Sequence, residues 1–244
     1  MSLIEGFDPF KVVKKALGSG GFSELYIEDS TTTSIIAEED RIEKVLAGRD
    51  KGAGLRLITE DDKTYYAYTN DVSEAGLTAL AESVSSAVRD KADGKGGSKD
   101  ISLMRKDIAE GFEIRISPES VNLKEKIDFV NRGNTTARKM DKRIVQVKVV
   151  YGDATKKTAI VNSLGEWVEE TKSSVLYLAQ VVAAEGDIIQ TGYEPLGGLL
   201  GIEIFDEKTP EDIAELAAKR AVMMLGAKKA PGGSMGVILS SEAG

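Results

Sequence analysis

The chain has 244 residues, of which 41% are hydrophobic, enough to bury one substantial core or two small ones. Its 32 basic and 40 acidic residues give a net charge of −8, and the acids are spread along the chain, which excludes general attraction to nucleic acid. No apolar run approaches the roughly 18 to 20 residues that span a bilayer, and the amino terminus lacks the pattern of a secretory signal. We therefore expect a globular, cytoplasmic protein with neither nucleic acid nor membrane as a partner.

The sequence contains no cysteine and no histidine. Without thiols it has no disulfide, no thiolate nucleophile and no cysteine-based metal site. Without imidazole it has no Ser-His-Asp triad, no conventional zinc site and no base with an ordinary pKa near neutrality. Chance explains these absences as well as a structural reason does, because both residue types are uncommon. Any chemistry of this chain alone would use carboxylates, Lys, Tyr, Ser or Thr.

The first ninety residues predict a helix, a series of strands and a second helix. Asp8 as the N-cap and Pro9 at the first helical position open a helix that ends before Gly18. A second helix, with apolar residues at helical spacing, runs from about Ser73 to about Asp90. Between the helices, five short extended runs predict an antiparallel meander with one solvated face: Glu24–Glu28, Ser34–Ala37, Arg41–Leu46, Gly54–Ile58 and Thr64–Tyr68.

Residues 91–100 are polar, charged and rich in glycine, and we assign 91–120 as a linker between a first half, 1–90, and a second half, 121–244. Asn122 and Glu125 open the next helix with the spacing of a capping box. Thr209 and Pro210 open a last helix that reaches Gly226. Five more strands are expected between these helices: Ile144–Tyr151, Lys157–Val161, Trp167–Glu170, Ser174–Ala184 and Ile188–Gly192.

Both halves thus show the same order of elements, a helix, about five strands and a closing helix. This order predicts an α+β fold in which antiparallel sheets pack with helices. It also suggests an internal duplication of a helix–strands–helix unit. The two halves are not visibly similar in sequence, so the duplication rests on element order alone.

Three short motifs resemble functional loops. Gly18-Ser19-Gly20-Gly21 has the composition of a phosphate-binding loop, but such loops open a helix and a strand follows here, which favours a helix C-cap and turn. Gly152 to Thr158 (GDATKKT) lacks the second glycine of a Walker loop, and we interpret it as a hairpin turn. Asn134-Thr135-Thr136 fits the glycosylation pattern but lies in a predicted helix, so we interpret it as a chance match.

Two acidic clusters and one aromatic cluster are further candidates. Glu38-Glu39-Asp40 and Glu169-Glu170 could hold a hard cation, although adjacent carboxylates near strand ends and turns are usually solvated. The tyrosines at 65, 66 and 68 could form a binding surface, although alternating aromatics in a strand more often divide between core and rim. On this basis no catalytic, cofactor-binding or metal-ligating residue is assigned to the chain.

Several longer stretches, taken in order, resemble one family. FSELYIE (22–28), EDRIEK (39–44), GAGLR (52–56) and YAYTND (66–71) look like the opening of TldD-type proteins. Gly192-Tyr193-Glu194, AKRA (218–221), APGG (230–233) and Val237-Ile238-Leu239 are similar to the segment before that family's catalytic motif. The chain thus resembles the amino-terminal portion of a TldD/PmbA family metallopeptidase (modulator of DNA gyrase family), and EDRIEK and GAGLR look closer to the TldD-like branch.

The resemblance implies a zinc peptidase in which a His-Glu-x-x-x-His helix, expected after the end of this sequence, holds the metal. Zinc would activate water and polarise the peptide carbonyl, and the motif's glutamate would move the proton. The family also implies a PmbA/TldE-like partner subunit or a homodimer, enclosing the site so that only peptides or unfolded segments enter. This half would help to wall that chamber. Alone, it is expected to bind no zinc and to be inactive.

A stand-alone binding or assembly module is the alternative, and it explains the missing histidine equally well. The chain ends at Ser240 to Gly244, directly after an apolar run and with no helix to cover that run. This favours an interrupted longer chain that lacks its catalytic carboxyl-terminal domain.

Overall fold

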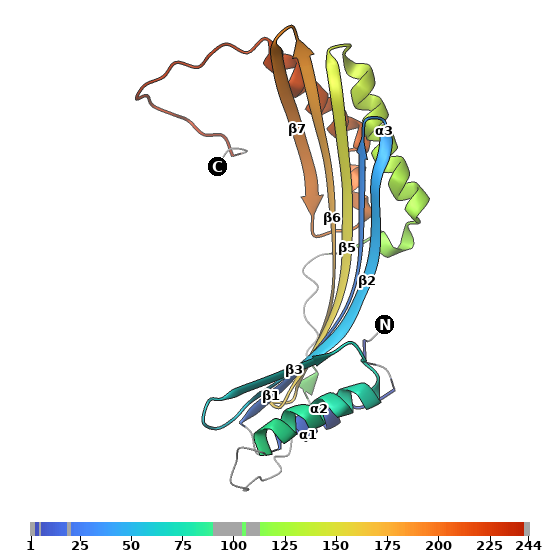
Figure 1. Cartoon of the computed structure of the whole chain (residues 1–244), viewed down its shortest axis with the longest axis vertical. Coiled ribbons are helices and arrows are strands. Elements are labelled where there is room, and N and C mark those ends of the chain that lie inside the picture. Colours follow the sequence, from blue (N-terminus) through green and yellow to red (C-terminus); the bar gives the residue numbers. More distant parts are fainter. Residues whose placement is uncertain (1–2, 5, 19–20, 90–103, 106–112, 242–244) are drawn as a thin grey trace.

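The computed structural model describes residues 3–4, 6–18, 21–89, 104–105 and 113–241. In these ranges the fold is α+β, as expected, and four α-helices lie against a single sheet with the strand order β3-β2-β1-β5-β6, in which β7 and the short β4 both pair with β6 (Figure 1). In chain order the elements are α1 (Pro9–Leu17), β1 (Phe22–Glu38), β2 (Arg41–Ile58), β3 (Thr64–Thr69), α2 (Glu74–Arg89), β4 (Met104–Arg105), the 3₁₀-helix η1 (Pro118–Ser120), α3 (Leu123–Met140), β5 (Ile144–Asn162), β6 (Glu166–Glu185), β7 (Ile188–Gly198), the 3₁₀-helix η2 (Ile202–Asp206) and α4 (Pro210–Leu225).

The strands are much longer than the sequence predicts. Two predicted runs, Glu24–Glu28 and Ser34–Ala37, belong to the one strand β1, and the polar residues between them stay paired on both sides. The prediction of a hairpin turn at Gly152 to Thr158 is wrong, because the stretch lies inside β5 between β1 and β6. Backbone pairing continues through these polar stretches because the ladder uses main-chain groups and needs no apolar side chain.

The two halves meet at the antiparallel pair β1–β5. Each half contributes a helix, three strands and a closing helix, in the orders α1-β1-β2-β3-α2 and α3-β5-β6-β7-α4. The pairing is continuous from Glu24 opposite Asn162 to Glu38 opposite Lys148, so each strand crosses from its own half into the other. The observed order repeats as the predicted one does, and the duplication itself stays a prediction.

Two hydrophobic cores lie on the helix side of the sheet. The first contains Leu25 and Ile27 of β1 with residues of α1, α2, β2 and the end of β5. The second contains Ile35 of β1 with residues of α3, α4, the start of β5, β6 and η2. Between the cores, the waist of the sheet carries ion pairs on this side, such as Asp29–Arg49 and Lys157–Glu119. Figure 1 shows that the sheet bends along its length and that the helices lie on its outer side, leaving a concave face open.

The predicted helix starts are confirmed. The Asp8 carboxylate accepts the Phe10 N–H, and the Asn122 side-chain oxygen accepts the Glu125 N–H. Thr209 and Asp212 form a complete capping box. Such caps satisfy N–H groups that the first helical turn leaves without partners, which is why these local signals predict helix starts well.

Two of the family-like motifs contact each other where α4 covers β7. Gly192 lies against the helix, and a Cβ at this position would overlap the Ala217 carbonyl oxygen and the Ala221 nitrogen. Two residues further along β7, the buried Glu194 carboxylate forms an ion pair with the Arg220 guanidinium of α4 at 2.6 Å. The glycine thus permits the close approach of helix and strand, and the ion pair fixes their register.

A buried carboxylate fastens the chain before η1 to η2. Glu203 accepts backbone N–H groups from Gly201 at 2.9 Å, Arg115 at 3.1 Å and Ile116 at 2.9 Å. Burial by itself raises the pKa of Glu203, but these N–H donors outweigh burial and the pKa is lowered overall. The carboxylate therefore stabilises the fold above its unfolded-state pKa, and this stabilisation is lost as pH falls through the lowered value.

The Glu203→Gln variant tests this anchor. Because the amide replaces one charged acceptor and brings an N–H₂ group toward backbone donors, we expect the free energy of unfolding at pH 7 to fall by about 1–3 kcal/mol. Urea denaturation at pH 7 and at acidic pH measures the change. The difference between wild type and variant should shrink in acid, and an equal difference at both pH values would contradict the anchor. Glu215→Gln, at an exposed ion pair of α4 with Lys219, is the control.

The contact between α4 and β7 predicts a second stability effect. The Gly192→Ala substitution should lower the free energy of unfolding by about 1–3 kcal/mol, because the helix must move away from the strand. Gly48→Ala in β2 is the matched control, because the nearest atom to the added Cβ would be the Thr32 hydroxyl oxygen, at an ordinary contact distance of 3.9 Å. Chemical denaturation of both variants measures the difference. Equal stabilities would show that α4 does not press on β7 at this position.

Candidate functional site on the concave face

The concave face is built by strand alternation. Successive side chains of a strand point to opposite faces, so the neighbours of each core residue point away from the helices. One cross-strand row on this face runs through Ser34, Gly152, Leu176 and Gly197 on four adjacent strands. Two glycines therefore flank Leu176, whose side chain is 49% exposed. The row forms a depression around a single apolar side chain.

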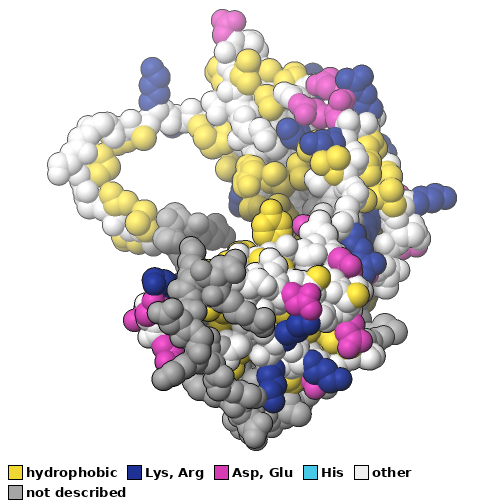
Figure 2. Space-filling model, turned by 60° about the horizontal axis from the view of Figure 1, so that its bottom comes forward, with side chains coloured by type: hydrophobic (Ala, Val, Ile, Leu, Met, Phe, Trp, Pro, Cys, Tyr) yellow, Lys and Arg dark blue, Asp and Glu magenta, His cyan; other side chains and the backbone are white. Residues whose placement is uncertain are grey.

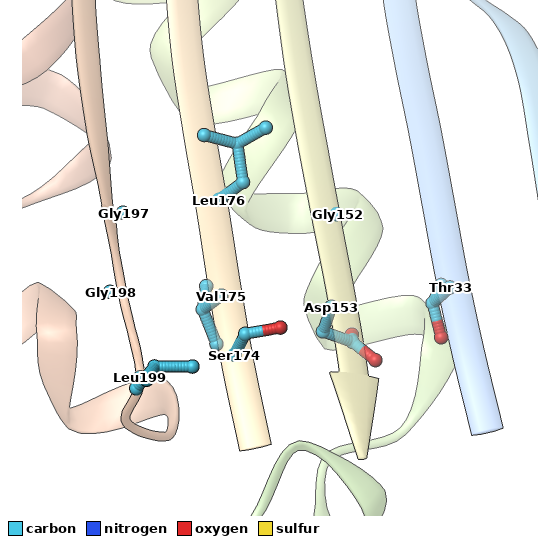
Figure 3. Close-up of a pocket in the computed structure, with 9 residues that line it drawn as sticks. All are labelled: Thr33, Gly152, Asp153, Ser174, Val175, Leu176, Gly197, Gly198 and Leu199. Atoms are coloured by element: carbon cyan, nitrogen blue, oxygen red, sulfur yellow. The ribbon is translucent and has the colours of Figure 1, made fainter. Parts of the chain in front are cut away.

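A pocket of about 500 Å³ occupies this depression (Figure 3). Its lining contains no residue of the helices, which cover the other face, so it opens to the concave side. Leu176, Ser174 and Leu199 provide side-chain walls, and the glycines leave the space that side chains would fill. The full lining is Thr33, Gly152, Asp153, Ser174, Val175, Leu176, Gly197, Gly198 and Leu199.

Apolar side chains surround the pocket on the same face. The row beside it joins Ile36, Val150, Leu178 and Pro195 across four strands. The row through Ser34 continues into β2 at Leu46, which pairs with Ser34 and is 54% exposed. We call this surface the apolar patch; it consists of Ile36, Leu46, Val150, Leu176, Leu178, Pro195 and Leu199.

Charged residues and tyrosines also lie on the concave face. At the waist, Lys156 pairs with Glu28 at 2.6 Å, and its hydrogen bond holds the pKa of that carboxyl below its usual value. Lys172 pairs with Glu170 at 2.8 Å in the same region. Beyond the waist, Tyr66 and Tyr68 of β3 stand exposed. The face thus has an apolar end, a charged middle and an aromatic end, which suits an extended ligand better than a compact one.

A buried polar cluster supports the pocket floor from the helix side. The carboxylate of Asp153 accepts the Tyr151 hydroxyl at 2.6 Å and pairs with the Lys126 ammonium of α3 at 2.6 Å. Lys126 also donates to the Thr33 hydroxyl at 3.2 Å. Burial, with the nearby Asp153 carboxylate, raises the pKa of Tyr151, so its hydroxyl stays protonated and remains a donor. The cluster ties α3 to β1 and β5 under the pocket.

Removing the cation from this cluster should be costly. We expect Lys126→Met to lower the free energy of unfolding by about 3–5 kcal/mol, because Asp153 is left as a buried, uncompensated charge. Adding Asp153→Asn removes the charge and should restore most of the loss. Denaturant unfolding of the single and double variants measures both effects. Lys172→Met, at an exposed pair, is the control, and a loss as small as the control's would contradict the role of Lys126.

The motifs at Gly18 and Asn134 contribute to the fold: one ends a helix and the other forms a hydrogen bond within a helix–turn contact. Gly18 is the C-cap of α1, as interpreted, and residues 19–20 of that motif lie outside the described residues. Asn134 lies within α3, and its side chain is buried and donates to the Asp40 carboxylate at 2.8 Å. The same carboxylate accepts the Arg138 guanidinium at 3.1 Å, so part of the first acidic cluster fastens the β1–β2 turn to α3.

The remaining acidic and aromatic candidates do not come together in one site. Glu169 and Glu170 lie in β6, where the Trp167 indole donates to Glu169. Tyr65 packs against the first core while Tyr66 and Tyr68 are exposed, so the aromatics divide between core and rim as interpreted. The sequence analysis did not predict the pocket. The pocket forms only because strand pairing places Gly152 and Gly197 beside Leu176, and no motif in the sequence indicates that pairing.

The residues present do not fit a zinc ion. Across the part of the chain that the structure describes, no group of three or more Asp or Glu side chains could hold a metal ion. The full sequence supplies neither imidazole nor thiolate, the ligands that zinc prefers in proteins. The concave face can therefore offer contacts and space to a bound molecule, but it lacks the side chains that coordinate zinc. Among the helices of the described ranges, none is long and apolar enough to cross a membrane.

Comparison with known proteins gives one consistent family. Residues 23–89 match the model of PmbA/TldA metallopeptidase domain 1, and residues 116–225 match the model of the PmbA/TldA metallopeptidase central domain. A metalloprotease of Methanothermobacter thermautotrophicus is 26% identical over 224 residues, covering 91% of this chain and 47% of the relative. A metalloprotease TldD homolog of Buchnera aphidicola is 25% identical over 228 residues, covering 90% and 46%. The chain spans about half the length of the curated relatives that it matches.

Solved structures show the same fold. The crystal structure of a proposed modulator of DNA gyrase from Thermotoga maritima aligns with a TM-score of 0.70 at 21% identity, covering 87% of this chain and 46% of that one. TldE from Thermococcus kodakarensis aligns with a TM-score of 0.68 at 15% identity, covering 87% and 46%. Because the two family models together match well over half of the 244 residues, the chain belongs to the PmbA/TldD metallopeptidase family.

Proposed function

We propose that the chain forms the first and central domains of a TldD-like zinc metallopeptidase that cleaves peptides or unfolded segments inside a subunit-enclosed chamber. The observation that carries the proposal is the match of both domain models, in order, across one continuous sheet. Relatives of about twice the length are metalloproteases, which supports assigning the zinc ligands to a second half outside these 244 residues. First half, linker and second half keep the bounds 1–90, 91–120 and 121–244 in this proposal.

The concave face supports a role as a chamber wall. It carries a pocket and the apolar patch at one end and exposed tyrosines at the other, with no helix over it in the described ranges. An extended chain in a chamber needs apolar contacts and room more than it needs local charge. A PmbA/TldE-like subunit, or a second copy of the same chain, would close the chamber. The TldD-like branch is supported by the similarity to the Buchnera TldD homolog.

The proposal predicts where zinc and activity reside. The purified 244-residue chain should bind no stoichiometric zinc and should not hydrolyse an unfolded peptide, because it lacks imidazole and thiolate ligands. The product of the native gene should exceed 26.2 kDa and contain zinc. Intact mass, metal analysis and a peptidase assay on the same samples measure this, with the Methanothermobacter metalloprotease as the positive control.

Two results would overturn parts of this proposal. Zinc-dependent turnover by a verified 244-residue chain would show that the active site lies within it. A native product of 26.2 kDa without zinc would favour the alternative, a stand-alone binding or assembly module.

A further inference from the structure

One edge of the sheet, formed by β7, is unsuited to pair with a further strand. Pro195 lies within β7 and has no N–H group to donate to a neighbouring strand. On the same strand, the Tyr193 carbonyl oxygen already accepts the Arg220 guanidinium of α4 at 2.8 Å. A proline and an occupied carbonyl group are features that protect a sheet edge from another chain.

The opposite edge is open along most of β2. The edge strand β3 pairs with β2 only from Ala53 to Ile58. Residues 41–52 of β2 therefore pair with β1 on one side and with no described strand on the other, and we call this stretch the open edge. It contains no proline. An edge of this length leaves a row of main-chain N–H and C=O groups with which another strand can pair.

The described part of the chain that follows α4 leads away from the open edge. β2 and β7 lie at opposite margins of the sheet, with β1, β5 and β6 between them (Figure 1). α4 packs on β7 and β6, and Figure 2 shows the segment after it projecting from the body on the same side as in Figure 1, away from β2. Residues 226–241 thus leave the open edge uncovered.

The charges of the open edge are complementary to those of a second copy. If two copies pair antiparallel about a twofold axis at Ala47, Lys44 of one copy stands opposite Asp50 of the other, and Glu43 stands opposite Lys51. Lysine on a sheet edge ordinarily opposes pairing, but here each lysine faces an acid. Within the described part of their own chain, neither Lys44 nor Asp50 has an ion-pair partner.

This register also keeps the faces of the two sheets matched. Lys44 and Asp50 both lie on the concave face, since they pair with Ile36 and Ser30 of β1. A twofold axis through Ala47, perpendicular to the sheet, leaves the concave faces of both copies on the same side. The opposite charges therefore meet on one face of the joined sheet.

The nearest alternative registers that keep the faces matched are less favourable. With the axis at Leu46, Arg41 stands opposite Lys51, which places like charges together. With the axis at Gly48, the apolar Leu46 stands opposite Asp50. The register centred between them instead places Leu46 of each copy beside Gly48 of the other. Leu46 is 54% exposed in the single chain, and the glycine leaves room to cover it.

We propose that two copies of this chain pair antiparallel through the open edge of β2, about a twofold axis at Ala47, and so join their sheets into one. Main-chain hydrogen bonds supply the contact, and the charges select the register. The two concave faces then adjoin at Leu46, so the apolar patch of one copy continues into that of the other. The pairing uses only residues of this chain and does not depend on zinc or on peptidase activity.

Sedimentation velocity of the 244-residue chain measures the association. We expect the mass to rise from 26.2 kDa toward twice that value as the protein concentration increases through the micromolar range. Lys44→Glu should raise the dissociation constant at least about tenfold, because it places two acids opposite each other in both symmetry-related pairs. Asp50→Lys should do the same. The double variant restores opposite charges and should recover the wild-type constant. Lys142→Glu, at an exposed position before β5, is the matched control and should change nothing.

An introduced cysteine locates the twofold axis. Because the chain contains no cysteine, Ala47→Cys supplies a single thiol that meets its own copy across the axis. Mild oxidation or a short bismaleimide should link these chains in pairs at concentrations at which the dimer forms. Glu60→Cys, in the exposed turn between β2 and β3, is the control and should stay unlinked. Slow amide exchange in β5 verifies that each variant is folded.

Three outcomes would overturn the inference. A chain that stays at 26.2 kDa throughout the concentration range would show that the open edge does not pair with a second copy. A dimer that both single charge reversals leave unchanged, or that the double variant fails to recover, would lie on another surface or in another register. Equal linkage of the Ala47→Cys and Glu60→Cys chains would show that the thiols meet only by random collision.

Discussion

The fold depends on the antiparallel ladder between β1 and β5. This pair joins the two halves over fifteen continuous residue pairs, from Glu24 opposite Asn162 to Glu38 opposite Lys148. Each strand begins in one hydrophobic core and ends in the other, so neither core is built from one half alone. Because a one-residue slip would move every core side chain to the concave face, both cores hold the same register. The long ladder thus connects the two hydrophobic cores through strands that they share.

The concave face follows from the same constraint. With all the helices that the structure describes on one side of the sheet, alternate residues of each strand stay on the other side, and their chemistry is free to differ from that of the core. The waist shows this on both faces, with Lys156–Glu28 on one and Asp29–Arg49 on the other. Beside the waist, Gly152 and Gly197 leave the hollow next to Leu176. Sheet curvature and these glycines, together with Leu199 directly after β7, therefore create the candidate site.

The composition of this chain indicates which part of the proposed enzyme it supplies. In the proposed enzyme, a chain without imidazole or thiolate would shape and enclose the site, and the ligands of a catalytic zinc would come from elsewhere. The buried cluster of Lys126, Asp153 and Tyr151 is consistent with this structural role, since it braces the pocket floor and faces the helices. What the concave face offers is apolar contact, space and a rigid frame.

The sequence by itself determined the helices and the family. Caps at Asp8, Asn122 and Thr209 act over three or four residues, so local pattern sufficed to place the helix starts. The absence of histidine and cysteine likewise needed no structure. Only the tertiary structure decided that the short predicted strands join into long ones, that Gly152 to Thr158 is strand, and that Gly152, Leu176 and Gly197 lie side by side. These features depend on pairing between residues far apart in the chain, and register between distant strands leaves no local signal in the sequence.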